Sequence, residues 1–175
     1  MRSIPLNAKV VDVGCGGGFP SLPIAILRED ISVKSLDSTG KKIDFVKYAI
    51  DELGLSKSSA VCTRAEDFAI EGKESFDCCV SRAVARLNVL SELCLALVKV
   101  GGIFVAMKAD KGQEELGEAK NGIAKLGGEI RNVVKSKLGY NGDEISRELI
   151  VIEKVKQTPQ QYPIKTNIYS CFPFL

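Results

Sequence analysis

Short apolar segments rich in β-branched residues alternate along this chain with segments of helical periodicity. The first apolar segment is 9–13, and a helical pattern begins near Pro20. The second is 31–36, followed by a helical pattern over 41–53. Parallel strands need a crossover long enough to hold a helix, so this alternation is typical of a mostly parallel sheet. It predicts a doubly wound α/β fold.

The alternation continues and then changes near the end of the chain. Further strands are predicted at 60–63, 76–80 and 103–107, and further helices at 89–98 and 114–126. Two strand-like segments, 130–138 and 148–155, then flank Asn141-Gly142 with no room for a crossover helix between them, which indicates an antiparallel hairpin. We expect one Rossmann-like domain over 1–156 with a seven-stranded sheet, and a tail over 157–175.

Composition places the chain among globular proteins. Its 175 residues, 45% hydrophobic and 26% charged, suit a single domain with a sizeable core. No apolar run approaches the roughly 18 residues of a membrane-spanning helix, and the N-terminus has no apolar signal core. We expect a cytoplasmic monomer that does not enter a membrane.

Cysteine and histidine usage restricts the chemistry. None of the six cysteines stands in a C-x-x-C pair, and Cys78 and Cys79 adjoin within an apolar run. This pattern favours buried free thiols in a reducing compartment. The chain has no histidine, the commonest metal ligand and general base, and we expect no metal. The formal net charge of +2 gives nucleic-acid binding no support.

A glycine-rich run, 12–18, follows the first predicted strand directly. Gly14, Gly16 and Gly18 permit a tight turn that a ligand can approach closely, at the edge where doubly wound folds bind nucleotides. The dinucleotide fingerprint fails because Phe19 occupies its third glycine position, and no G-K-[ST] follows for a Walker A loop. The alternative is a flexible turn without a ligand. The pattern acid-x-G-x-G-x-G resembles the first motif of class I methyltransferases.

An acidic residue, Asp37, ends the second predicted strand. An acid at that position would accept hydrogen bonds from the two ribose hydroxyls of a nucleoside cofactor. Its distance along the chain from the glycine run favours a cofactor site over a plain turn.

The segment 81–85, Ser-Arg-Ala-Val-Ala, lies where the acceptor of such a fold would sit. It contains neither the N/D-P-P-Y/F motif of exocyclic-amine methyltransferases nor the nucleophilic cysteine of cytosine-C5 enzymes. Methyl transfer to a ring nitrogen lone pair, such as guanine N7, needs no proton removed there, which suits a chain without histidine. Arg82 is the candidate catalytic residue, holding the cofactor or the guanine edge. The alternative is a solvent-facing arginine at a strand end.

Together these motifs resemble the glucose-inhibited division protein B family, whose members methylate guanine N7 in small-subunit (16S) ribosomal RNA. The matching segments are 11–20, 36–38, 40–42, 64–66, 81–85, 87–90, 104–108 and 149–154. The resemblance implies S-adenosylmethionine as cofactor and ribosomal RNA or the 30S particle as partner. It places Asp37 on the cofactor ribose, and implies as further cofactor contacts Gly14, Phe19, Ala65, Glu66 and Arg82.

Three of these side chains have plainer interpretations. Phe19 could be a core aromatic, and Glu66 a first-turn acid that complements a helix dipole. Lys108 could be a solvated lysine at a strand end rather than a group near RNA.

The sequence also departs from the family pattern. We expect it to lack the helical segment that precedes the glycine run in family members, and residues 164–175 are mostly apolar where the family is basic. Three alternative functions therefore stand: a cofactor-binding domain without catalysis, a methyltransferase for a small molecule or protein, and a nicotinamide dehydrogenase.

Overall fold

The computed structural model describes residues 4–109, 112–140 and 143–163. One sheet of seven strands has the order β3-β2-β1-β4-β5-β7-β6. The strands are β1 (Lys9–Val13), β2 (Ser32–Asp37), β3 (Ser58–Cys62), β4 (Phe76–Arg82), β5 (Val98–Lys108), β6 (Gly128–Tyr140) and β7 (Asp143–Lys154). Strands β1 to β5 pair in parallel, and β7 runs antiparallel to both of its neighbours. The predicted fold class is confirmed.

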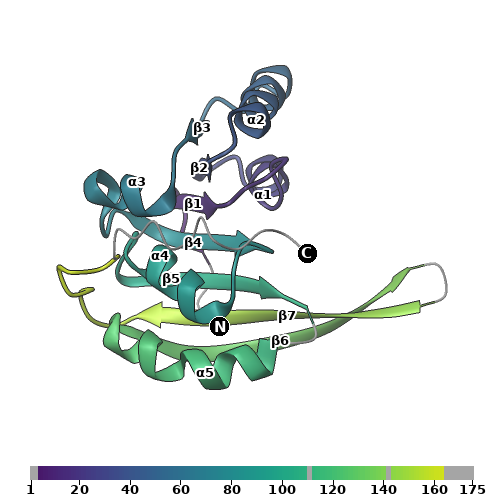
Figure 1. The fold of residues 1–175 in the computed structure, drawn as a ribbon. Coiled ribbons are helices and arrows are strands. Elements are labelled where there is room, and N and C mark those ends of the chain that lie inside the picture. The colour runs from purple at the N-terminus through teal and green to yellow at the C-terminus, as the bar shows by residue number, and fades with distance from the viewer. Residues whose placement is uncertain (1–3, 110–111, 141–142, 164–175) are drawn as a thin grey trace.

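Helices cover both faces of the sheet (Figure 1). Those in the described residues are α1 (Ser21–Leu27), α2 (Gly40–Glu52), α3 (Ala65–Gly72), α4 (Leu87–Leu95) and α5 (Gly112–Lys125). Helices α1 and α2 pack on one face, and α3, α4 and α5 on the other. In Figure 1 the hairpin of β6 and β7 runs on past the other strands.

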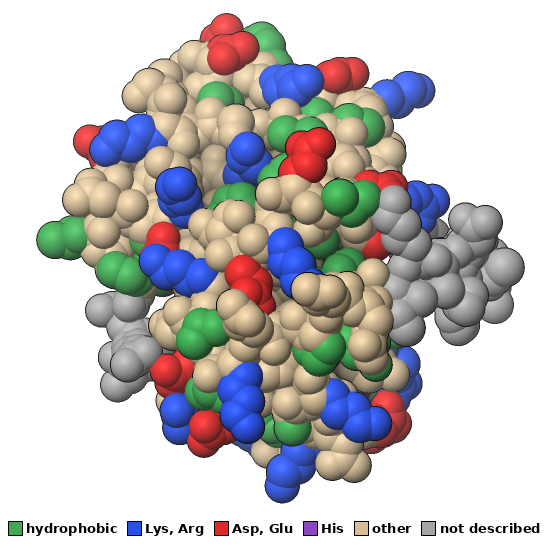
Figure 2. Space-filling model, turned by 90° about the vertical axis from the view of Figure 1, so that its left-hand side faces the viewer, with side chains coloured by type: hydrophobic (Ala, Val, Ile, Leu, Met, Phe, Trp, Pro, Cys, Tyr) green, Lys and Arg blue, Asp and Glu red, His purple; other side chains and the backbone are tan. Residues whose placement is uncertain are grey.

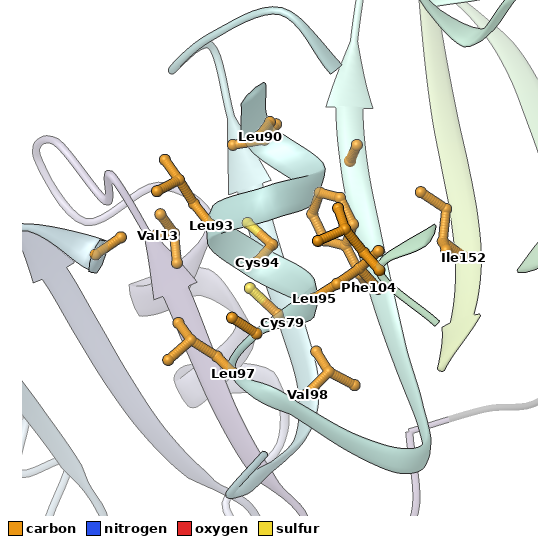
Figure 3. Close-up of a cluster of buried hydrophobic side chains, with 14 of the residues drawn as sticks. Val13, Cys79, Leu90, Leu93, Cys94, Leu95, Leu97, Val98, Phe104 and Ile152 are labelled. Atoms are coloured by element: carbon orange, nitrogen blue, oxygen red, sulfur yellow. The ribbon is translucent and has the colours of Figure 1, made fainter. Parts of the chain in front are cut away.

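The central strand β4 separates two apolar clusters by simple alternation. Cys78 belongs to the cluster beneath α1, and Cys79 to the cluster beneath α4, because successive side chains of a strand point to opposite faces. Figure 3 shows Cys79 packed among α4 side chains and Phe104 of β5. Both thiols are free and buried, as expected, whereas Cys62 is free and exposed.

Three parts of the fold differ from the sequence prediction. Helix α3 was not placed by periodicity because it has only eight residues. The helix predicted over 89–98 ends at Leu95, and Val98 begins β5. The residues from Leu93 to Val98 are all buried, so neither a helical nor a strand period is visible there. The hairpin strands are longer than predicted, and Asn141-Gly142 lies outside the described residues.

The order of the strands places the candidate site. Strand β1 is flanked by β2 on one side and β4 on the other. The chain runs from β1 outward to β2 and β3, and then crosses back to place β4 on the other side of β1. Doubly wound folds bind ligands at the carboxyl edge beside such a reversal. None of the helices in the described residues is long and apolar enough to cross a membrane.

Candidate functional site

The predicted site residues all lie at strand ends, on loops or at helix starts along the carboxyl edge of the parallel strands. The glycine run follows β1, Asp37 ends β2, and Arg82 ends β4. Ala65 and Glu66 begin α3, just after β3. The fold therefore gathers at one edge residues that are up to 68 positions apart in the sequence.

The glycine run closes tightly over the carboxyl end of β2. The amides of Gly14 and Cys15 both donate to the carbonyl of Leu36, at 2.8 and 2.9 Å. Gly14 has φ 71°, and a Cβ there would overlap the side chain of Val84. Gly16 has φ 56° with no atom near the position of a Cβ, so its backbone faces open space. Only a residue without a side chain fits Gly14, and Gly16 leaves room for a ligand.

Asp37 links the end of β2 to the glycine run. Its side chain is 9% exposed. One carboxylate oxygen accepts the Gly16 amide at 3.0 Å, and the other accepts the Thr39 amide at 2.9 Å. The ammonium of Lys42 lies 3.8 Å away. Each oxygen keeps a further lone pair, so the carboxylate can still accept two hydroxyls of a ribose.

Asp12, the acid that opens the glycine motif, is fully buried beneath this loop. Its Oδ2 accepts the Ser21 amide at 3.1 Å, while Oδ1 has no hydrogen-bond partner within the described residues. Burial raises the pKa of Asp12 to about 6, and hydrogen bonding from Ser21 and the charge of Arg82 partly oppose the rise. Asp12 is not among the cofactor contacts predicted from the sequence, although it is the acidic residue of the glycine motif.

Cys15 lies within the glycine run but is unsuited to nucleophilic chemistry. It is 2% exposed, and burial, reinforced by the negative charges of Asp12 and Asp37, raises the pKa of its thiol to about 12. The thiolate is the reactive form, so this cysteine is inert near neutral pH.

Arg82 and Phe19 meet across the site. The guanidinium carbon of Arg82 lies 5.7 Å from the centroid of the Phe19 ring. The ring is 53% exposed, so Phe19 is not a core aromatic. The buried hydroxyl of Ser81 donates to the carbonyl of Val13 at 2.7 Å and joins the ends of β4 and β1. Arg82 is exposed, as the plainer interpretation expected, but it is held over an aromatic surface beside the glycine run.

Ala65 and Glu66 are both buried in the first turn of α3. The amide of Thr63 donates to the backbone carbonyl of Asp37 at 3.0 Å, which holds the start of this helix beside β2. The guanidinium of Arg64 lies 3.9 Å from the Glu66 carboxylate. This position is compatible with a cofactor contact and with the helix dipole, so the role of Glu66 stays a prediction.

Lys108 is not the solvated lysine of the plainer interpretation. Its side chain is 9% exposed, and its ammonium lies 2.7 Å from Glu115 of α5 and donates to the carbonyl of Ala85 at 2.6 Å. Glu115 also accepts the amide of Leu87, the first residue of α4. Lys108 and Glu115 therefore anchor the loop that follows Arg82, a role that no local sequence signal indicated for Glu115.

The sheet order, the position of the reversal and the glycine run define the fold of class I methyltransferases. A solved structure titled as an rRNA methylase from Streptococcus thermophilus superposes with a TM-score of 0.65 at 17% identity, covering 87% of this chain and 90% of that one. Geranyl diphosphate C-methyltransferase from Streptomyces coelicolor, solved with S-adenosyl-L-homocysteine, superposes with a TM-score of 0.65 at 16% identity, covering 85% and 73%. At such identities the likeness concerns the fold alone.

Sequence comparison identifies the family within this class of methyltransferases. The profile of the family named rRNA small subunit methyltransferase G matches residues 2–149. A protein of that name from Desulforamulus reducens is 46% identical over 167 residues, which cover 94% of this chain and 69% of the relative. The chain belongs to this family of methyltransferases, and the resemblance seen in its motifs is confirmed. It spans about two thirds of the length of the relatives it matches.

Proposed function

We propose that this chain transfers a methyl group from S-adenosylmethionine to N7 of a guanine in 16S ribosomal RNA, as a cytoplasmic monomer. The observation that carries the proposal is the contact between Asp37 and the Gly16 amide at the carboxyl edge. It presents a carboxylate and an open stretch of backbone side by side, as a nucleoside cofactor requires.

The residues present fit that cofactor. Asp37 has free lone pairs for the ribose diol, and Gly16 offers backbone without a side chain. The Oδ1 of Asp12, which has no hydrogen-bond partner in the described part of the chain, lies beneath the same loop. A cationic ligand nearby would favour the ionised form of Asp12 against the cost of its burial. When bound, S-adenosylmethionine supplies a methyl group on a positively charged sulfur.

Arg82 is the residue we assign to the acceptor. Its exposed guanidinium at the end of β4 can donate to guanine O6 and leave the N7 lone pair free to form the new carbon–nitrogen bond. With the cofactor bound, its carbon–sulfur bond would break as the new bond formed, and no proton would leave N7. Orientation of the base is then the main task of the protein, and a general base is not needed.

The test is transfer of labelled methyl to small ribosomal subunits from a strain that lacks this modification, followed by nuclease digestion and mass spectrometry. We expect 7-methylguanosine at one position. Arg82→Ala should lower kcat/KM about 10- to 100-fold, the worth of one charged hydrogen bond. Arg131→Ala is the matched control, because Arg131 lies on the far edge strand in exposed ion pairs.

Other outcomes would contradict parts of the proposal. Unchanged transfer by Arg82→Ala would remove the role given to that residue. Cofactor binding without any transfer would favour a binding domain without catalysis. Methyl incorporation that persists after the RNA is digested and removed would favour a small-molecule or protein acceptor.

A further inference from the structure

A hollow of about 420 Å³ opens at the opposite, amino edge of the sheet. Three lysines line it from the start of three neighbouring segments: Lys9 begins β1, Lys34 lies near the start of β2, and Lys57 directly precedes β3. Figure 2 views the molecule from this edge and shows lysine and arginine side chains spread around it. The hollow is separate from the candidate active site, which lies at the other end of the same strands.

Two lysines of this hollow occupy strand positions that are ordinarily apolar in a doubly wound sheet. In β1 the side chain on this face changes from Lys9 to the buried Val11, and in β2 it changes from Lys34 to the buried Leu36. Helix α3 covers this face, but it has only eight residues and ends at Gly72, which carries no side chain. The amino ends of the strands are therefore left open.

Each of the two lysines of the hollow that belong to strands has a serine as its neighbour on the next strand. In the strand register Lys9 lies beside Ser32, and Lys34 lies beside Ser59. The ammonium of Lys34 lies 5.6 Å from the ring centroid of Phe68 on α3, which holds it over the hollow.

Within the described residues, no carboxylate neutralises the three lysines. None of them forms an ion pair within the described residues, and Lys57 donates only to the backbone carbonyl of Asp30. Many other cations are paired, for example Lys108 with Glu115. The only acidic residue among those lining the hollow is Glu71, so this surface concentrates positive charge in a chain of net charge +2.

We propose that this hollow binds backbone phosphates of the RNA substrate, an inference that rests on the proposed function. Ammonium and hydroxyl donors with little competing carboxylate suit phosphate oxygens, and such contacts position nucleic acid without reading its sequence. Because the hollow lies on the edge opposite Arg82, it cannot receive the guanine that is methylated. An RNA that crosses α3 would contact both edges, so the hollow contributes affinity and not chemistry.

The experiment measures the affinity of the full chain for small-subunit ribosomal RNA over a range of salt concentrations. Each phosphate contact contributes roughly 0.7–0.9 to the slope of log K against log salt. The triple variant Lys9→Gln, Lys34→Gln, Lys57→Gln should lower the magnitude of that slope by about 2 and weaken binding about tenfold or more at low salt. Cofactor affinity and kcat at saturating RNA should stay unchanged.

The control removes the same charge elsewhere, with Lys47→Gln, Lys120→Gln and Lys125→Gln on the exposed surfaces of α2 and α5. An equal loss of affinity in both triples would show a general charge effect and overturn the proposal. An unchanged salt slope for the Lys9, Lys34 and Lys57 variant would also overturn the proposal, and so would a loss of its kcat at saturating RNA. Methyl transfer by the wild-type chain tests the proposed function separately. If the wild type transfers methyl but the triple variant shows no specific loss of RNA affinity, the proposal for the hollow is wrong and the proposed function stands.

Discussion

The burial of Asp12 makes a pH-dependent contribution to stability that can be isolated by Asp12→Asn. The carboxyl is fully buried, and its pKa rises from 3.8 to about 6 on folding. Between these values the folded state holds more protons than the unfolded state. Stability from this group is therefore fully present below pH 4 and is lost as pH rises through 6.

The magnitude follows from the two pKa values. A shift of about two units corresponds to about 3 kcal/mol in total, at roughly 1.36 kcal/mol per unit. About 2 kcal/mol of this falls between pH 4.5 and 7.5, because part of the change occurs below pH 4.5. The asparagine does not titrate but keeps an oxygen that can accept the Ser21 amide.

The assay is unfolding by urea at several pH values between 4.5 and 7.5 for both proteins. The free energy of unfolding of the wild type, taken relative to Asp12→Asn, should fall by about 2 kcal/mol across that range. Asp51→Asn on the exposed side of α2 controls for the loss of one negative charge. A difference between wild type and Asp12→Asn that stays constant with pH would refute the assignment of a raised pKa to this carboxyl.

Two further substitutions test how the fold is held. Lys154 is fully buried, and its ammonium lies 3.2 Å from Glu74. In denaturant titrations, Lys154→Met should therefore lower the free energy of unfolding by about 3 kcal/mol, because it leaves the carboxylate of Glu74 without its partner. The control Lys156→Met, at an exposed position, should change it by less than about 0.5 kcal/mol. Gly14→Ala should lower Tm and weaken cofactor binding, because φ is 71° and the new Cβ would meet Val84. Val84→Ala added to it should recover part of the Tm by calorimetry, and no recovery would show that the collision is not the cause.

Much of the fold was predictable because its signals are local. The alternation of strand and helix patterns predicted the parallel sheet and the hairpin, and the glycine run with Asp37 predicted where the candidate site lies. The short helix α3 was not predicted because eight residues give too little periodicity. The boundary between Leu95 and Val98 was not predicted because a fully buried segment carries no amphipathic period.

The sequence by itself determined the types of element and the presence of a glycine loop, since both depend on neighbouring residues. Only the tertiary structure decided which distant groups meet. The Gly16 amide reaches Asp37 across 21 positions, and Lys108 is withdrawn from solvent by Glu115. The lysine hollow likewise exists only because three strand starts lie side by side. These contacts depend on strand order and register, which packing fixes across the whole sheet and no single segment encodes.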